Sequence, residues 1–162
     1  MAFRLVSSGG NVTDPAIVSM HASGVIRPGM VVQHGVALAA VSAALSTSPS
    51  TAIIGVSLDY VQGFSDTFVR VIPFAPGQIW EADCVSAVTT LHVLRRHRLG
   101  LTDPMLLENS GASTVNEGES ISVGVFFAYA LTGATTGSGK LLGTFLTGRQ
   151  AHRGTDNAQL GF

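Results

Sequence analysis

Short runs of β-branched and aromatic residues, separated by turn-forming residues, set the strongest limit on how this chain can fold. Apolar residues at helical three- and four-residue spacing are hard to find along the sequence. Runs of Val, Ile, Phe and Thr bounded by glycine and proline are typical of strands. They predict strands at Val25-Ile26, Met30–Gln33, Ala52–Leu58, Thr67–Phe74, Gln78–Cys84 and Leu141–Thr147. The chain is therefore predicted to be all-β, as an antiparallel β-sandwich or barrel.

A further strand is predicted over Ser120–Leu131, where large and small residues alternate. Period two places alternate side chains on opposite faces of a strand. We expect the larger side chains to fill the core and the smaller ones to allow close approach of a second sheet or subunit. The larger set is Ile121, Val123, Val125, Phe127, Tyr129 and Leu131.

Two proline-glycine pairs and one alanine-rich run add local detail. Pro28-Gly29 and Pro76-Gly77 have the composition of type II turns, in which glycine accepts a positive φ. Ala37–Leu45 is rich in alanine, which favours helix, but a helix of that length is marginal without packing. Both a helical and a non-helical structure stay open for it.

The ends of the chain differ from its centre. Residues 1–15 and 148–162 are polar or irregular and lack hydrophobic periodicity. We expect one β-rich domain over residues 16–147, with an extended N-terminal arm over 1–15 and an extended C-terminal arm over 148–162.

Charged residues are scarce. Nine Lys and Arg and ten Asp and Glu make up 12% of the chain, against about 25% in an average soluble domain. The net charge of -1 argues against a chain built to bind nucleic acid or an anionic membrane. With a mean hydropathy of +0.39, this surface is expected to be partly covered by other subunits of an assembly.

Targeting and membrane signals are not expected from this sequence. The first residues lack the apolar core of a signal peptide. The longest apolar run, Val123–Leu131, is far shorter than the roughly 20 residues of a membrane helix. The single cysteine, Cys84, rules out an intramolecular disulfide and is compatible with synthesis in a reducing compartment.

No motif predicts a cofactor or a metal. Ala134–Leu141 approaches a phosphate-binding loop, but Leu141 stands where the motif needs a hydroxyl, and the following residues alternate like a strand. The histidines do not have the spacing of a metal site; they are His21, His34, His92, His97 and His152.

Enzymatic activity is not expected either. Cys84 follows Glu81 and Asp83, whose negative charges oppose thiolate formation, so it is predicted to be a small interior residue. Six carboxylates could in principle supply a hydrolytic pair, but nothing in the sequence fixes their mutual distance; they are Glu81, Asp83, Asp103, Glu108, Glu117 and Glu119.

Two features could form contacts with other molecules. The run His92–Arg98 concentrates positive charge, and Arg95, Arg96, His97 and Arg98 could contact a neighbouring subunit or, less well supported, nucleic acid. A solvated edge or turn is the alternative. Trp80 could anchor an interface or a sugar ring, but a buried residue with its N–H satisfied explains it as well.

Several segments resemble small head proteins of tailed bacteriophages, namely the capsid decoration or cement proteins. The resemblance lies in Val69–Asp83 (VRVIPFAPGQIWEAD), Leu101–Pro104 (LTDP), Leu131–Ala134 (LTGA) and Gly139–Leu146 (GKLLGTFL). It implies a β-rich, oligomeric, non-enzymatic protein on the capsid exterior, made in the host cytoplasm. The implied partners are the major capsid protein, whose lattice it would stabilise by bridging capsomers, and further copies of the chain, as a trimer ahead of a dimer.

The resemblance also suggests a role for the two arms. Both could reach onto capsid subunits or sister copies, which adds Arg149, Arg153 and Phe162 to the expected interface. The alternative function is a carbohydrate- or receptor-binding module of a virion fibre. That function would require Trp80, Tyr60 and Tyr129 to line an exposed platform.

Overall fold

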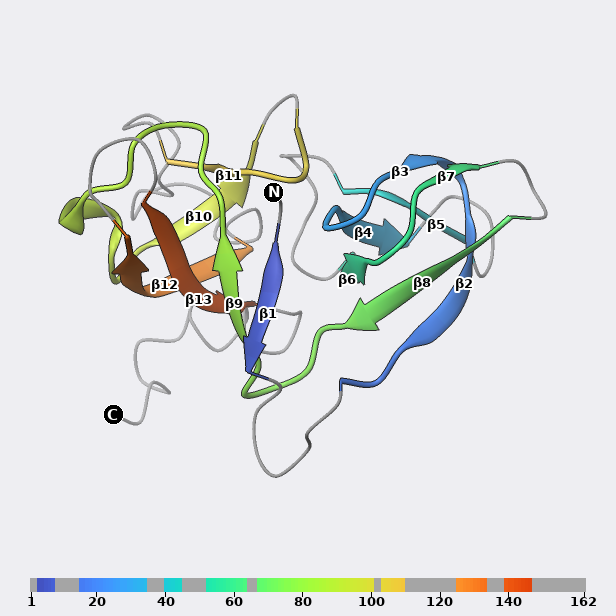
Figure 1. Ribbon diagram of the computed structural model, residues 1–162, viewed down its shortest axis with the longest axis horizontal. Helices are drawn as coiled ribbons and strands as arrows, with labels where there is room; N and C mark the ends of the chain where they lie inside the picture. The colour runs from blue at the N-terminus through green and yellow to red at the C-terminus, as the bar shows by residue number, and fades with distance from the viewer. Residues whose placement is uncertain are drawn as a thin grey trace.

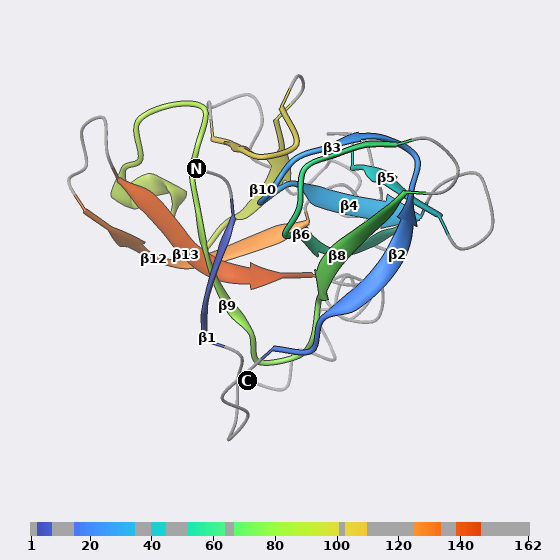
Figure 2. The same cartoon turned by 45° about the vertical axis from the view of Figure 1, so that its right-hand side comes forward.

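The computed structural model of the chain describes residues 3–7, 15–34, 40–44, 52–63, 67–100, 103–109, 125–133 and 139–146. Over these residues the secondary structure is all β apart from one short 3-10 helix, Thr90–His92. The predicted all-β class is confirmed. Figure 1 shows two neighbouring halves, a sheet and a barrel, and Figure 2 shows them after a turn of the molecule.

The first half is a six-stranded sheet with antiparallel pairing between neighbours. Its strands, in spatial order, are β1 (Arg4–Ser7), β9 (Ile79–Ala82), β13 (Lys140–Phe145), β12 (Phe126–Thr132), β10 (Arg96–Leu99) and β11 (Leu107–Glu108).

The second half is a closed five-stranded barrel covered by a two-stranded ribbon. The barrel strands, in spatial order, are β2 (Val18–Ala22), β5 (Ala40–Ala43), β4 (Val31–His34), β6 (Ile53–Ser57) and β8 (Phe68–Pro73), and the ribbon is β3 (Gly24–Ile26) with β7 (Val61–Gly63). The pair β2–β5 is parallel and the other barrel pairs are antiparallel. With an odd number of strands, alternating directions cannot close a ring, so one parallel pair is required.

The barrel is inserted into the sheet along the chain. Strand β1 precedes all the barrel strands and β9 follows them, yet β1 and β9 pair with each other, with Arg4 opposite Glu81 and Leu5 opposite Trp80. Phe3 is buried beside this strand. Residues 3–7 therefore belong to the sheet, whereas the sequence placed them in an N-terminal arm. The predicted C-terminal arm 148–162 lies outside the described residues.

Aromatic side chains join the two halves in one core. Phe145 of β13 lies 5.0 Å from Phe3, 4.1 Å from Phe74, 5.8 Å from Trp80 and 5.1 Å from Phe126, measured between ring centroids. The same core includes residues of the barrel strands, namely Val31, Ile53, Val56 and Ile72. A second core fills the barrel and is built from smaller side chains that include Val32, Val41, Val69 and Val71.

The predicted strands and turns are observed with small shifts of their ends. Each of the six short predicted strands overlaps an observed strand, namely β3, β4, β6, β8, β9 or β13. Gly29 and Gly77 have φ values of 78° and 84°, and Met30 N–H donates to the Arg27 carbonyl at 3.1 Å across the first turn. Both type II turns are confirmed.

The alanine-rich run Ala37–Leu45 contains a strand in its described part, residues 40–44. Ala40–Ala43 is β5, which pairs with β4 and β2, and Val41 is fully buried in the barrel. Helix propensity therefore does not decide this segment. The small alanines fit a barrel wall, and pairing on both sides satisfies the backbone.

The predicted orientation of the Ser120–Leu131 strand is wrong over Phe126–Tyr129, although Val125, from the expected core face, is buried. Phe126 and Ala128 are fully buried, whereas Tyr129, from the face expected to fill the core, is 47% exposed. The reason lies in the partner strand, where Gly143 stands opposite Ala128 and leaves space for the Phe126 ring. The alternation of large and small residues in one strand does not show where a neighbouring strand has a glycine.

We expect Gly143→Ala to destabilise the fold by about 3 kcal/mol, because overpacking a close-packed core forces neighbouring groups to shift. An added Cβ would lie 2.1 Å from the Phe127 carbonyl oxygen and 2.6 Å from the Phe126 ring. Denaturant unfolding measures the effect. The control Thr144→Ala, at a half-buried position of the same strand, should cost less than about 1 kcal/mol. Equal free energies of unfolding for Gly143→Ala and the wild type would contradict this packing.

Candidate interaction surfaces

Trp80 is a core residue. It is 1% exposed, and its Nε1–H donates to Gln78 Oε1 at 3.2 Å. Gln78 also accepts from the Ala75 N–H at 3.0 Å and donates to the Pro73 carbonyl at 3.1 Å. The indole is thus satisfied inside the chain, as the buried alternative requires, and Trp80 is removed from the expected interface.

The run Arg95–Arg98 does not form one positive patch. Arg95 is exposed before β10, but within β10 the side chains alternate. His97 is fully buried, and Arg96 and Arg98 are half-buried. Burial lowers the pKa of Arg96. Of the residues that the structure describes in this run, Arg95 presents its charge most openly, and His97 leaves the expected interface.

His97 lies between the sheet strands and the 3-10 turn. Its Nε2 is 2.8 Å from the His92 carbonyl oxygen, and the two imidazole rings are 6.1 Å apart. Desolvation is the main cause that lowers the pKa of His97; its backbone hydrogen bonds oppose this shift, and electrostatic interactions with His92 and Arg95 add to it. The imidazole is therefore held in its neutral form, with Nε2–H donating to His92.

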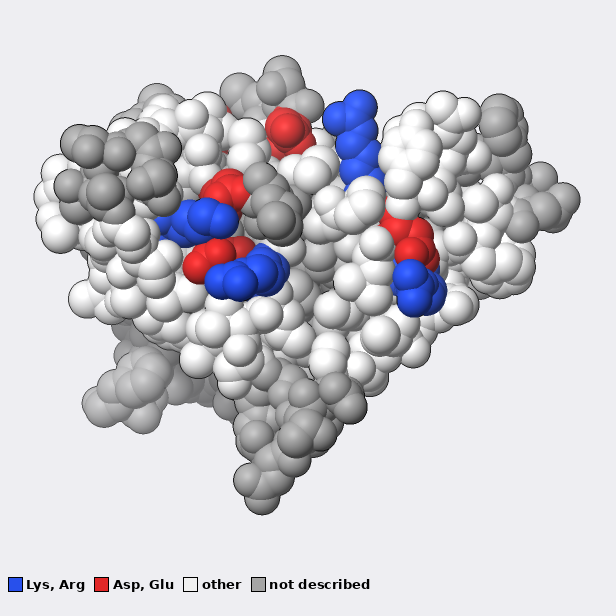
Figure 3. Space-filling view, in the orientation of Figure 1, with Lys and Arg blue, Asp and Glu red and all other residues white. Residues whose placement is uncertain are grey.

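Two of the carboxylates considered for catalysis, Glu81 and Asp83, form a neutral ion network with Arg4 and Lys140. Glu81 lies 3.1 Å from Arg4 and 3.3 Å from Lys140, and Asp83 lies 3.1 Å from the same lysine. Hydrogen bonding to Asp83 is the main reason that the pKa of Lys140 is raised. In Figure 3 these charges form alternating blue and red groups on one face. The network ties β1, β9 and β13 together and leaves no carboxylate of this group without a cation.

Cys84 is half-buried, and desolvation together with the neighbouring charge of Asp83 raises its pKa to about 12. The thiol is therefore a weak nucleophile, in agreement with the expected interior role.

Exposed apolar side chains are the features that sequence reasoning missed. They occur on both halves of the molecule: Val6, Ile17, Val18, Val25, Tyr60, Phe68, Ile79, Val85, Leu91, Leu94 and Tyr129. Many lie at outward positions of strands or in turns, where period two alone would predict polar residues. A predicted strand with apolar residues on both of its faces is the signal that could have identified these exposed side chains.

Leu91 and Leu94 are the most exposed of this set, at 72% and 71%. Leu94 has a φ of 58°, a conformation that costs a residue with a Cβ about 1–2 kcal/mol. Its N–H donates to the Ala128 carbonyl at 2.9 Å, and the Ala128 N–H donates to the Arg95 carbonyl at 3.0 Å. The sheet thus holds an apolar side chain in solvent in a strained backbone conformation.

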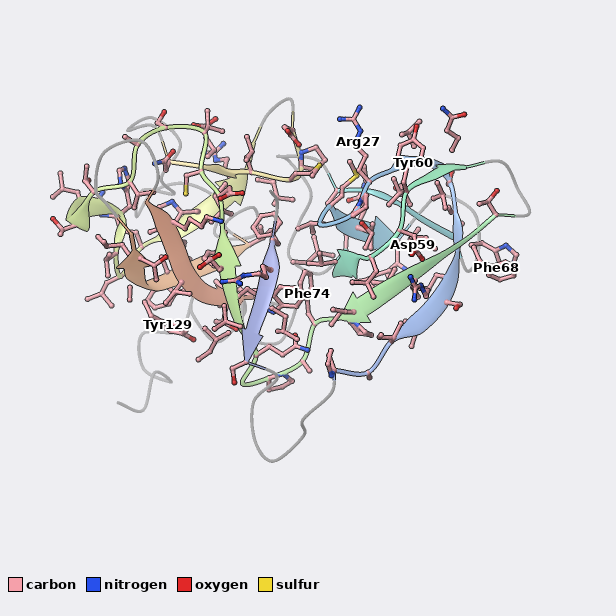
Figure 4. The ribbon with its side chains drawn as sticks, in the orientation of Figure 1. Arg27, Asp59, Tyr60, Phe68, Phe74 and Tyr129 are labelled. Atoms are coloured by element: carbon pink, nitrogen blue, oxygen red, sulfur yellow. The ribbon has the colours of Figure 1, made fainter. Side chains whose placement is uncertain are left out.

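The platform required for a carbohydrate-binding module is not assembled. Trp80 is buried, and Figure 4 shows Tyr129 on the sheet half and Tyr60 at the upper edge of the barrel half. The three residues therefore do not line one surface.

Within the described ranges, no group of three or more His, Cys, Asp and Glu side chains is arranged to hold a metal ion. Across the same part of the chain, no helix is both long and apolar enough to cross a bilayer. Arg149, Arg153 and Phe162 lie outside the described residues.

Comparison with known proteins shows a likeness among solved structures. No protein-family model matches the chain, and no curated protein matches it. Among solved structures, the chain is similar to the head fiber gp8.5 N base of bacteriophage phi29, with 16% sequence identity and a TM-score of 0.48. The match covers 81% of this chain and 94% of that chain. A likeness at this identity and score does not assign a function.

We expect acid to destabilise the chain through His97. Because its pKa is lower in the folded state, the unfolded chain binds more protons once the pH falls below about 6.5. The stability contributed by neutral His97 is complete above that pH and is lost below it, by at most about 1.4 kcal/mol per pH unit. His97→Gln does not titrate, and its unfolding free energy should fall less steeply with pH in urea titrations. Identical slopes for the two proteins would refute this role.

The Cys84 thiol should react slowly in the folded chain. A pKa near 12 leaves little thiolate at about pH 8, so alkylation by iodoacetamide should be at least roughly a hundredfold slower than in urea. Asp83→Asn removes one cause of the raised pKa but leaves desolvation, the larger one, so it should accelerate the reaction only partly. Comparable native and unfolded rates would contradict the burial of the thiol.

Proposed function

We propose that the chain is a non-enzymatic structural protein of a phage virion, a decoration or cement protein that binds the outer surface of the head. In this role it stabilises the lattice of the major capsid protein by bridging capsomers. The observation that carries the proposal is the number of large apolar side chains left in solvent on a chain with few charges. The sequence resemblance to decoration proteins suggests that the capsid is the partner of these exposed apolar side chains.

The distribution of these side chains suits a bridge. Leu91, Leu94 and Tyr129 belong to the sheet half, and Tyr60 and Phe68 belong to the barrel half. Figure 4 shows Tyr129 on the sheet half and Phe68 at the outer edge of the barrel half. A protein that joins two capsomers needs two separate contact regions, and the shared core described above holds these two in a fixed relation.

The mechanism is thermodynamic. A protein that binds only the assembled capsid lattice stabilises that lattice by mass action. The free energies of contacts repeated over the lattice add together. Each buried apolar side chain contributes about 1.5–3 kcal/mol before the ordering cost of association. Self-association, with a trimer ahead of a dimer, would cover part of the same surface.

Leu94 allows a test of the proposal without damage to the fold. Asparagine tolerates positive φ better than leucine, so Leu94→Asn should be at least as stable as the wild type. Combined with Leu91→Ser, it should weaken binding to undecorated expanded capsids by roughly tenfold or more. Binding is measured by cosedimentation, and the gain in capsid melting temperature is measured by calorimetry.

The matched control is Thr90→Ser, in the same 3-10 turn, which should bind as the wild type does. Light scattering of the free protein reports its oligomeric state. A stable wild-type monomer that neither binds capsids nor raises their melting temperature would overturn the proposal.

A further inference from the structure

One face of the β3–β7 ribbon carries a defined set of exposed side chains, Val25, Arg27, Tyr60 and Gln62, here called the ribbon face. Val25 pairs with Gln62 and Ile26 with Val61 across the ribbon. Continuing the register one step places Arg27 opposite Tyr60, and Figure 4 shows both at the upper edge of the barrel half. All four side chains are exposed, with Tyr60 at 57% and Val25 at 49%.

The opposite face of the ribbon is firmly anchored. Ile26 is fully buried and Val61 is 9% exposed, and both pack in the barrel core. The Arg27 carbonyl accepts from Ser57 Oγ and from the Met30 N–H, while the Gly29 N–H donates to the Ser57 carbonyl at 2.7 Å. The backbone beneath Arg27 and Tyr60 is therefore fixed before any partner arrives, which reduces the ordering cost of binding.

The polar groups of the ribbon face are mainly donors. The guanidinium of Arg27 makes no ion pair with any residue in the described part of the chain. Tyr60 Oη accepts from Gln62 Nε2 at 3.2 Å, which leaves the phenolic hydrogen free to donate. Apart from the Gln62 amide oxygen, the side chains offer no strong acceptor. A group that only accepts, such as a carboxylate, fits these donors.

Described acidic side chains of the chain itself are already engaged. Asp59 is held by Arg70 at 2.6 Å, and this hydrogen bond lowers the pKa of Asp59. Glu81 and Asp83 are held by Arg4 and Lys140. In Figure 3 one blue side chain lies at the upper edge, where Figure 4 labels Arg27. It does not form part of the red and blue pair below it.

From this geometry we propose that the ribbon face is a docking surface for an Asp or Glu side chain of another protein, surrounded there by apolar residues. The carboxylate receives hydrogen bonds from Arg27 and Tyr60, and the apolar surroundings cover Val25 and the Tyr60 ring. Tyrosine and arginine together are typical of binding hot spots. Nucleic acid is the less suitable partner, because a phosphate backbone needs several cations along one face and the ribbon face has one. That the partner is a capsid subunit rests on the proposed function. The preference of the ribbon face for a carboxylate does not rest on it, because it follows from the side chains alone.

The first experiment measures capsid binding of the full chain. Arg27→Gln should weaken binding by roughly ten- to a hundredfold, and Tyr60→Phe, which removes only the hydroxyl, by roughly fivefold. Added salt should weaken the wild type more than Arg27→Gln. The control Arg4→Gln removes the same charge from the sheet half and leaves Glu81 paired with Lys140; it should bind as the wild type does. Normal binding by Arg27→Gln and Tyr60→Phe would overturn the docking surface while leaving the proposed function in place.

A second experiment does not depend on capsids. The isotope-labelled chain is titrated with N-acetyl-aspartate methylamide and, in parallel, with the neutral N-acetyl-asparagine methylamide, and the Arg27 Nε–H signal is followed by NMR. The acidic probe alone should shift this signal, and Tyr60→Phe should reduce the shift. An equal response to both probes, or none to either, would overturn the assignment. If the wild type binds no capsid, the proposed function fails and this titration alone decides the ribbon face.

Discussion

The aromatic cluster around Phe145 is the contact on which the rest of the structure depends. It brings together rings from the start of the chain, from the end of the barrel and from the last described strand, and it makes the barrel and the sheet share one core. Such rings bury a large apolar area, and edge-to-face pairs add further stabilisation. The position of every surface group on one half relative to the other half follows from this cluster.

Much of the fold could be predicted from the sequence because its signals are local. Val and Ile runs next to proline-glycine turns predicted the strands β3, β4, β6, β8, β9 and β13. Strands with weak local signals were missed: β1 depends on pairing with β9, and β5 depends on two neighbours in a barrel wall. The buried face of β12 was predicted wrongly because Gly143, on another strand, decides it.

The candidate surfaces were less predictable for a related reason. Trp80 and the charges of residues 95–98 are conspicuous in the sequence, but burial is a property of the tertiary fold, and it removes Trp80 and His97 from the surface. The ribbon face has no such signal. Arg27 and Tyr60 are far apart in the chain and become neighbours only through the register of two short strands. Arg27 is an exposed cation without an ion pair among the described residues, and it stands beside an exposed tyrosine only because of the strand pairing, which sequence patterns do not contain.

The insertion of the barrel between β1 and β9 also affects how the chain reaches its native state. Phe3 and β1 leave the ribosome before the barrel strands, but their partner strand emerges only after the whole barrel has been synthesised. The barrel strands pair over shorter separations and fill their own core, so the barrel has the earlier opportunity to form. During that interval Phe3 and β1 lack their partner strand β9, which makes translation up to β9 the stage most exposed to misassociation between nascent copies.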